Sequence, residues 1–234
     1  MPDKEFLRVL AALFAALLFS FSAKAFASMP AWMVTNEVIE AAQGTWYDLN
    51  GNVAFVVEGD RLNGRRIVHA LNFAGSHACH ADFFLEGENL GDSPAHFIRW
   101  LPNRRFLTLD GTTCRNTREP EYFESVRGVY LGMKLDDMFA LLGEPERNIK
   151  NRRFEWPDVT VNTEDGIVTA IFLPKGGARL DGSGLGADDT PEDFAAAYGF
   201  PEAWNGQESR EIGNSGEYLQ RKEELLLLSL FERQ

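Results

Sequence analysis

The densest group of side chains able to do chemistry lies in residues 76–82. It holds two histidines, a cysteine and a carboxylate, namely His77, Cys79, His80 and Asp82. Imidazole, thiolate and carboxylate groups are ligands that zinc and copper accept. The spacing matches no standard zinc signature, because a second pair of ligands is missing nearby. We therefore expect two surface histidines beside a cysteine, and keep a metal-dependent enzyme using His77 and His80 as an alternative.

The other patterns that suggest chemistry have simpler explanations. The carboxylates of Asp188, Asp189, Glu192 and Asp193 have the chemistry for calcium, but their order does not follow an EF-hand loop. Negative charge is also favoured at the start of a helix. The sequence contains no Gly-x-Ser-x-Gly, no P-loop and no His-Glu-x-x-His. We expect a protein that is not an enzyme, with no catalytic residues and no cofactor.

Aromatic residues are the remaining candidates for a binding site. Exposed aromatic side chains anchor interfaces, whereas buried ones fill a core. The positions that we single out for binding a ligand or partner are Trp46, Trp156, Trp204 and Tyr218. Their types alone leave both roles open, although the surroundings of Trp156 favour the core.

The first residues resemble an export signal. Lys4 and Arg8 precede an apolar run over Val9–Phe21, and Ala25-Phe26-Ala27 is a small-x-small cleavage site. A spanning helix needs roughly 20 residues, so a membrane anchor is the less favoured alternative. We expect residues 1–27 to be a signal peptide, and the mature protein to be secreted or periplasmic without a stable membrane anchor.

Charge and cysteines fit that location. The chain has a net charge of −12, and removing the signal peptide takes away +1. An acidic surface disfavours nucleic acid. Cys79 and Cys114 are the two cysteines, and in an oxidising compartment such a pair most often forms a disulfide. Free thiols or a thiol at a metal site remain the alternatives.

Residues 28–118 predict an antiparallel β domain that follows a short amphipathic helix. Turn signals such as Asn50-Gly51, Asn63-Gly64 and Asp110-Gly111 separate runs rich in Val and Phe. We expect about six strands, which form a meander or partial barrel. These strands are at Thr45–Tyr47, Asn52–Glu58, Arg65–Phe73, Ala81–Leu85, His96–Trp100 and Arg105–Leu109.

Gly44-Thr45-Trp46-Tyr47 resembles the Gly-x-Trp signature in the first strand of lipocalins. This resemblance implies a lipocalin-like protein that binds a small apolar ligand, our second hypothesis. Six strands are too few for a full eight-stranded calyx, so we expect half a barrel at most. The test is whether a set of apolar residues lines a cavity or fills it: Trp46, Phe55, Val57 and Phe84.

A repeat organises the second half of the chain. A short acidic helix ends in Gly-x-Pro-Glu twice, at Gly143–Glu146 and at Gly199–Glu202, and strands follow each copy. Each glycine is suited to the positive φ that ends a helix, and each proline prevents the helix from restarting. The second helix, predicted over Pro191–Tyr198, has Thr190 as its N-cap. The first is predicted over Lys134–Leu142, with Lys134 a poorer cap.

The first copy resembles the SmpA/OmlA (BamE-like) module. The residues that carry the match are Gly128, Gly132, Met133, Leu141, Leu142, Gly143 and Pro145. The family has two helices packed on a three-stranded antiparallel sheet, and related tandem modules occur in a β-lactamase inhibitor protein. The resemblance implies a non-catalytic scaffold that binds proteins outside the cytoplasm. The chain lacks the lipobox cysteine of the envelope lipoproteins, and its second copy matches more loosely.

These observations predict an α+β chain. An N-terminal antiparallel β meander or partial barrel is followed by two small helix-on-antiparallel-sheet modules, at residues 119–180 and 181–234. The function that fits best is non-catalytic binding of a protein of the bacterial cell envelope or the extracellular space.

Overall fold

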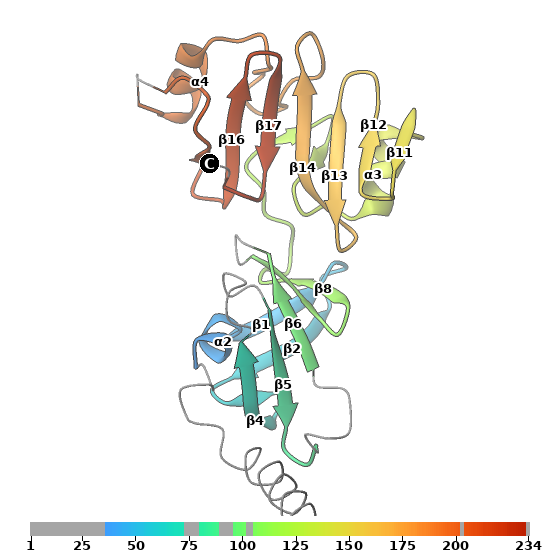
Figure 1. Cartoon of the computed structure of the whole chain (residues 1–234), viewed down its shortest axis with the longest axis vertical. Helices are drawn as coiled ribbons and strands as arrows, with labels where there is room; N and C mark the ends of the chain where they lie inside the picture. Colours follow the sequence, from blue (N-terminus) through green and yellow to red (C-terminus); the bar gives the residue numbers. More distant parts are fainter. Residues whose placement is uncertain (1–35, 73–79, 89–95, 102–104, 202–203, 233–234) are drawn as a thin grey trace, which may run out of the picture.

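The chain folds into two lobes, each built on antiparallel β structure (Figure 1). The computed structural model describes residues 36–72, 80–88, 96–101, 105–201 and 204–232. The predicted signal peptide lies outside these residues. Among the helices of the described ranges, none is long and apolar enough to cross a membrane.

The N-terminal lobe is a closed barrel of eight strands in sequential order. Its strands are β1 (Gly44–Asp48), β2 (Val53–Glu58), β3 (Arg61–Leu62), β4 (Arg65–Asn72), β5 (His80–Leu85), β6 (His96–Trp100), β7 (Phe106–Leu109) and β8 (Thr112–Arg115). The barrel closes because β1 pairs with β2 on one side and with β8 on the other, where Tyr47 lies opposite Arg115. A bulge between Trp46 and Tyr47 bends β1. The predicted half barrel is therefore wrong.

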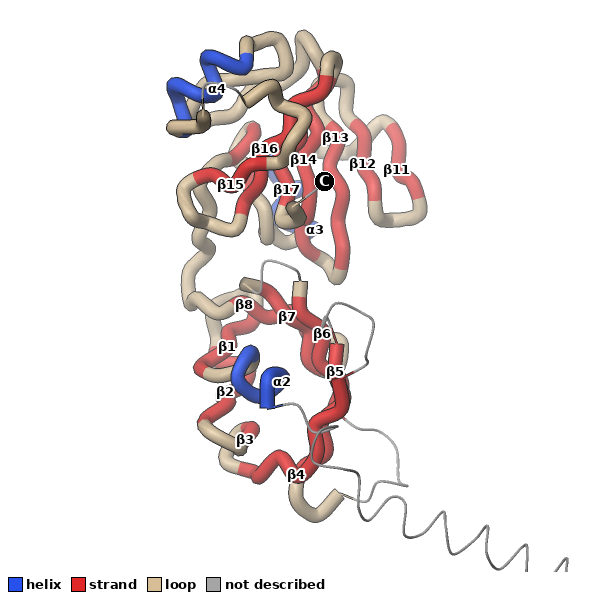
Figure 2. The backbone as a smooth tube through the Cα atoms, turned by 60° about the vertical axis from the view of Figure 1, so that its left-hand side comes forward, coloured by secondary structure: helices blue, strands red, loops and turns tan. Residues whose placement is uncertain are grey.

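Buried side chains form a core inside the barrel, and a helix covers one of its ends. Alternation along the strands sends one residue in two inward, as Ile98 and Trp100 do in β6. The helix is α2 (Asn36–Ala41), which lies over the ring of strands in Figure 2. Just after it, the carbonyl of Ala42 accepts a hydrogen bond from the indole Nε1 of Trp46 at 2.8 Å. Trp46 thereby joins the covering segment to the barrel core.

The C-terminal lobe is built on one seven-stranded sheet, in the order β11-β12-β13-β14-β17-β16-β15. Its strands are β11 (Arg147–Ile149), β12 (Arg153–Glu155), β13 (Thr160–Glu164), β14 (Ile167–Pro174), β15 (Arg210–Ile212), β16 (Glu217–Lys222) and β17 (Leu225–Ser229). A two-stranded ribbon of β9 (Ser125–Val126) and β10 (Val129–Tyr130) precedes the sheet.

The predicted fold class, α+β with two separate helix-on-sheet modules, is wrong. The strands of the two repeats form a single sheet, because β14 pairs with β17 over five residue pairs from Ala170–Ser229 to Pro174–Leu225. The helices are only eight residues each, so the described chain is mostly β structure. Pairing the repeats lets them share one hydrophobic core, which a single small module would lack.

The helices themselves follow the sequence closely. Helix α3 spans Leu135–Leu142 and α4 spans Pro191–Tyr198. Thr190 caps α4 in a full capping box with Asp193, whereas Lys134 offers α3 no side-chain cap. Both helices end at a glycine with positive φ, as predicted.

The lobes meet through packing and polar contacts. Leu101 and Phe106 follow and begin barrel strands, yet they belong to the core of the C-terminal lobe. Arg99 of β6 pairs with Glu164 and Asp165 at the β13–β14 turn. The hydroxyl of Thr113 donates to the carbonyl of Asp165 at 2.6 Å. The contacts tie the rim of the barrel to one end of the sheet.

Candidate interaction face

The pairing register assigns the side chains of the seven-stranded sheet to two faces. Phe154, Val161, Ile171 and Leu228 form one row across four strands. They share a hydrophobic core with Met138 of α3 and Phe194 of α4, among others. Both helices therefore pack on this face.

The opposite face carries no described helix, and in Figure 1 α3 lies behind the sheet. Apart from one leucine, its two central rows contain small, polar and aromatic side chains, and none of the residues in these rows belongs to either hydrophobic core. We call these eight residues the open face: Thr160, Asn162, Ala170, Phe172, Tyr218, Gln220, Leu227 and Ser229.

Small buried residues form the centre of the open face, and two aromatic side chains lie beside them. Ala170 and Ser229 are small and buried in the middle strands. Phe172 on β14 and Tyr218 on β16 are partly exposed. The guanidinium of Arg153 lies 5.6 Å from the centre of the Phe172 ring, a cation–π contact. Such a surface offers aromatic contact area at little cost in side-chain entropy.

Two amide side chains of the open face have unused hydrogen-bonding capacity. The side-chain oxygens of Asn162 and Gln220 are buried without a partner. The Gln220 amide nitrogen donates to the carbonyl of Gln207 at 2.7 Å, which fixes that side chain. Buried polar atoms normally have a partner, so an acceptor without one calls for a structural or functional explanation.

The two ends of the open face differ in charge. At the β11–β12 end, Arg147 and Arg153 both pair with Glu155, at 3.2 Å and 2.8 Å. Two cations share one carboxylate, which leaves positive charge in excess. At the other end Glu211 and Glu232 surround Tyr218, and burial first and these carboxylates second raise the pKa of its hydroxyl. Tyr218 is therefore neutral at physiological pH.

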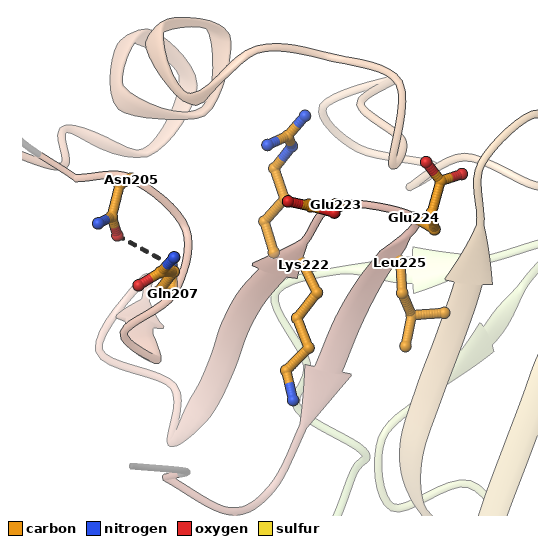
Figure 3. Close-up of a pocket in the computed structure, with 7 residues that line it drawn as sticks. Asn205, Gln207, Lys222, Glu223, Glu224 and Leu225 are labelled. Carbon is orange, nitrogen blue, oxygen red and sulfur yellow. Dashed lines mark hydrogen bonds between the residues drawn. The ribbon is translucent and has the colours of Figure 1, made fainter.

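A hollow of about 610 Å³ lies at the β16–β17 hairpin, next to the open face. Figure 3 shows Lys222 and Leu225 on neighbouring strands and a hydrogen bond between Asn205 and Gln207. Its charges are mixed, so it favours no single ionic ligand. The residues that line it are Asn205, Gln207, Arg221, Lys222, Glu223, Glu224 and Leu225.

The four aromatic residues singled out from the sequence lie in different parts of the structure. Trp46 is 2 % exposed in the barrel core, and Trp156 and Trp204 are 8 % and 4 % exposed in the core of the C-terminal lobe. Only Tyr218 lies on the open face. Phe172, Asn162 and Gln220 were missed, because their face depends on which strands pair.

The residues chosen to test the small-ligand hypothesis also differ in how deeply they are buried. Trp46, Phe55 and Val57 are buried in the barrel core, and the rings of Trp46 and Phe55 stack at 6.0 Å. Phe84 is only partly buried and meets His69 edge to face. The first three belong to the described core of the barrel, and the small-ligand hypothesis stays a prediction.

The metal and disulfide candidates lie mostly beyond the described residues. His77 and Cys79 fall outside them, and His80 begins β5 without a described side chain. Within the described ranges, no three His, Cys, Asp or Glu residues form a metal-binding group. Cys114 is buried and has no disulfide partner among the described residues, and burial raises the pKa of its thiol to about 11. The disulfide to Cys79 stays a prediction.

One histidine does form a charged cluster. The Nδ1 of His96 lies 2.6 Å from Asp110, and its Nε2 lies 3.3 Å from Glu88, which also pairs with Arg65. Burial of the ring opposes its charged form, but the two carboxylates outweigh burial and raise the pKa of His96. The imidazole joins β6 to the β5 and β7 turns, a structural role.

Comparisons with protein-family models, curated proteins and solved structures found no match. The geometry of the open face is therefore the basis for assigning a function.

Proposed function

We propose that the protein is a non-catalytic, extracytoplasmic binding protein, and that the open face contacts a folded protein of the cell envelope or the extracellular space. The observation that carries this proposal is a seven-stranded sheet whose two described helices, α3 and α4, pack on the same face. On the other face Phe172 and Tyr218 are partly exposed, next to the small residues Ala170 and Ser229. Aromatic residues in such a setting are typical interface anchors.

The charges of the open face indicate what the partner presents. Arg147 and Arg153 share one carboxylate, so acidic side chains of the partner fit over that end. The acidic residues near Tyr218 suit a basic group. A folded protein with this pattern is the occupant that we propose.

The resemblance of the first repeat to BamE-like modules supports the proposal. Its matched glycines, Gly128, Gly132 and Gly143, all have positive φ, as turns and helix ends require. We infer that the C-terminal lobe serves as a protein-binding scaffold and that the barrel supports it. The predicted signal peptide is the reason to look for the partner outside the cytoplasm.

The test places a photo-crosslinking amino acid at Phe172 and, in a second variant, at Leu141. Leu141 is an exposed residue of α3 on the helix-covered side, and serves as the matched control. The expected result is a crosslink to one protein from Phe172 and none from Leu141. The purified partner must then bind the wild-type chain, with affinity about tenfold lower for Tyr218→Ala, as loss of an interface anchor predicts.

Three outcomes would contradict the proposal. Crosslinks from both positions alike would indicate nonspecific capture. A crosslinked second copy of the chain would make the open face a dimer interface instead. Equal binding of the partner by wild type and by a Tyr218→Ala, Phe172→Ala double variant would place the contact elsewhere.

A further inference from the structure

Two glutamates lie in the interior of the C-terminal lobe. Glu124 comes from the segment that connects the barrel to the sheet, and Glu217 is the first residue of β16. Their exposed fractions are 2 % and 1 %. Burying a carboxylate is costly unless it is well hydrogen-bonded or carries a proton.

Both carboxyl groups bind backbone N–H groups of other segments. Glu217 accepts from the amides of Phe123 and Glu124, at 2.9 Å and 3.2 Å. Glu124 accepts from the amides of Gly182 and Ser183, at 2.9 Å and 3.0 Å. The two side chains thus join the connecting segment to β16 and to the turn that precedes α4.

A tyrosine completes the cluster from the end of α4. The hydroxyl of Tyr198 donates to Glu124 at 2.6 Å and lies 2.7 Å from the hydroxyl of Ser183. Burial and the neighbouring carboxylates raise the pKa of Tyr198, so it keeps its proton as a hydrogen-bond donor. The ring of Phe123 packs near it, at 6.2 Å between centroids.

The cluster also touches the barrel. Arg105, just before β7, donates to the carbonyl of Ser215 and, at 3.0 Å, to the carbonyl of Glu121. Its positive charge lies near enough to Glu217 to favour the ionised carboxylate. The groups that act on Glu217 are therefore Arg105, Glu124 and the two amides, whereas Tyr198 binds Glu124.

Burial dominates these effects, and it raises the pKa of Glu217 from 4.5 to about 7. The amides and Arg105 lower the pKa, while the negative charge of Glu124 raises it. Between about pH 4.5 and pH 7 the folded chain therefore holds a proton that the unfolded chain releases. Stability from this group is present at low pH and is lost as the pH rises through this window.

We propose that the Glu124–Glu217 cluster is a proton-dependent latch that holds residues 121–125, and with them the junction of barrel and sheet, in place. With a proton on the pair, one buried negative charge is left, and the donors described above stabilise it. When the proton passes to solvent, two carboxylates share the interior and the connecting segment loosens. The latch does not depend on the proposed partner.

The test is amide hydrogen exchange of the full chain at pH 6 and pH 8, corrected for the intrinsic effect of pH. The amides of Phe123, Glu124, Gly182 and Ser183 should lose about tenfold in protection at pH 8, the change expected when one carboxyl with a pKa near 7 titrates. Amides of the barrel, such as that of Ile98, should change less. Equal protection at both pH values would overturn the latch.

Two variants separate the latch from a general effect of pH. Glu217→Gln cannot ionise, so its protection should be nearly the same at both pH values. Glu223→Gln, an exposed change in the turn that follows the same strand, should behave like wild type. If Glu217→Gln does not fold, carbon NMR of wild-type glutamate carboxyls decides. One glutamate carboxyl must titrate near pH 7. If every glutamate carboxyl has an ordinary pKa, the proposal is refuted.

Discussion

At Gly132 the ring of Phe106 occupies the space in which any other residue would place its Cβ. A Cβ built there would lie 2.1 Å from Cζ of Phe106, and the φ of Gly132 is +87°. The backbone of the C-terminal lobe thus approaches an aromatic ring of the barrel as closely as glycine alone permits. A side chain at position 132 would therefore disturb the packing between the two lobes.

We expect Gly132→Ala to lower the free energy of unfolding by about 2 kcal/mol or more, because overpacking adds to backbone strain. The matched control is Gly166→Ala. Gly166 also has a positive φ, +77°, but nothing lies within 4 Å of its would-be Cβ. Gly166→Ala should lower the free energy of unfolding only by the backbone strain, about 1 kcal/mol. Urea denaturation of both variants measures the two changes in the free energy of unfolding. Equal changes would show that the Phe106 ring moves aside without cost.

Cys114 should be unreactive in the folded protein. It is buried, and its pKa of about 11 leaves little thiolate at pH 8. We expect iodoacetamide to modify it only after denaturation. If Cys79 and Cys114 are bridged as predicted, denaturation without a reductant will still leave both unmodified. Rapid labelling of Cys114 in the native state would contradict its burial.

Among the elements, α4 shows how far local sequence determines structure. Thr190 accepts from the amide of Asp193, and the Asp193 carboxylate accepts from the amide of Thr190. Because eight residues make a marginal helix, its ends matter. Thr190→Ala should lower the free energy of unfolding by about 1 kcal/mol. Glu192→Gln, in the same turn but outside the box, should change it by a few tenths. Equal effects would show that charge matters more than the cap.

The same local signals made the helices and most strands predictable. Thr190, Pro191 and Gly199 mark both ends of α4, and runs of Val and Phe mark the longer strands. Barrel closure was not predictable, because it depends on pairing Tyr47 with Arg115, far apart in sequence. The sheet depends in the same way on pairing β14 with β17. Since the open face follows from that register, composition could identify Tyr218 but not its neighbours.

For the whole molecule, the contacts between lobes predict cooperative unfolding. Phe106 and Leu101 contribute to the core of the other lobe, and Arg99 bonds to its β13–β14 turn. We expect one thermal transition for wild type. Phe106→Ala should cost about 3 kcal/mol or more and separate the transitions of the two lobes. Val53→Ala, an exposed change on the barrel, should leave a single transition. Two transitions in wild type would mean that the lobes are stable independently.

Strand β17 lies in the interior of the sheet, between β14 and β16, although it follows both of them in the sequence. During synthesis, one edge of β14 stays unpaired until residues 225–229 have emerged from the ribosome. An exposed strand edge is a site of aggregation, and Ile171 and Leu173 make this one apolar. The C-terminal lobe therefore cannot fold stepwise behind the ribosome. Its completion depends on residues 225–229, and a chain that stops before β17 should be recognised by the cell as unfolded.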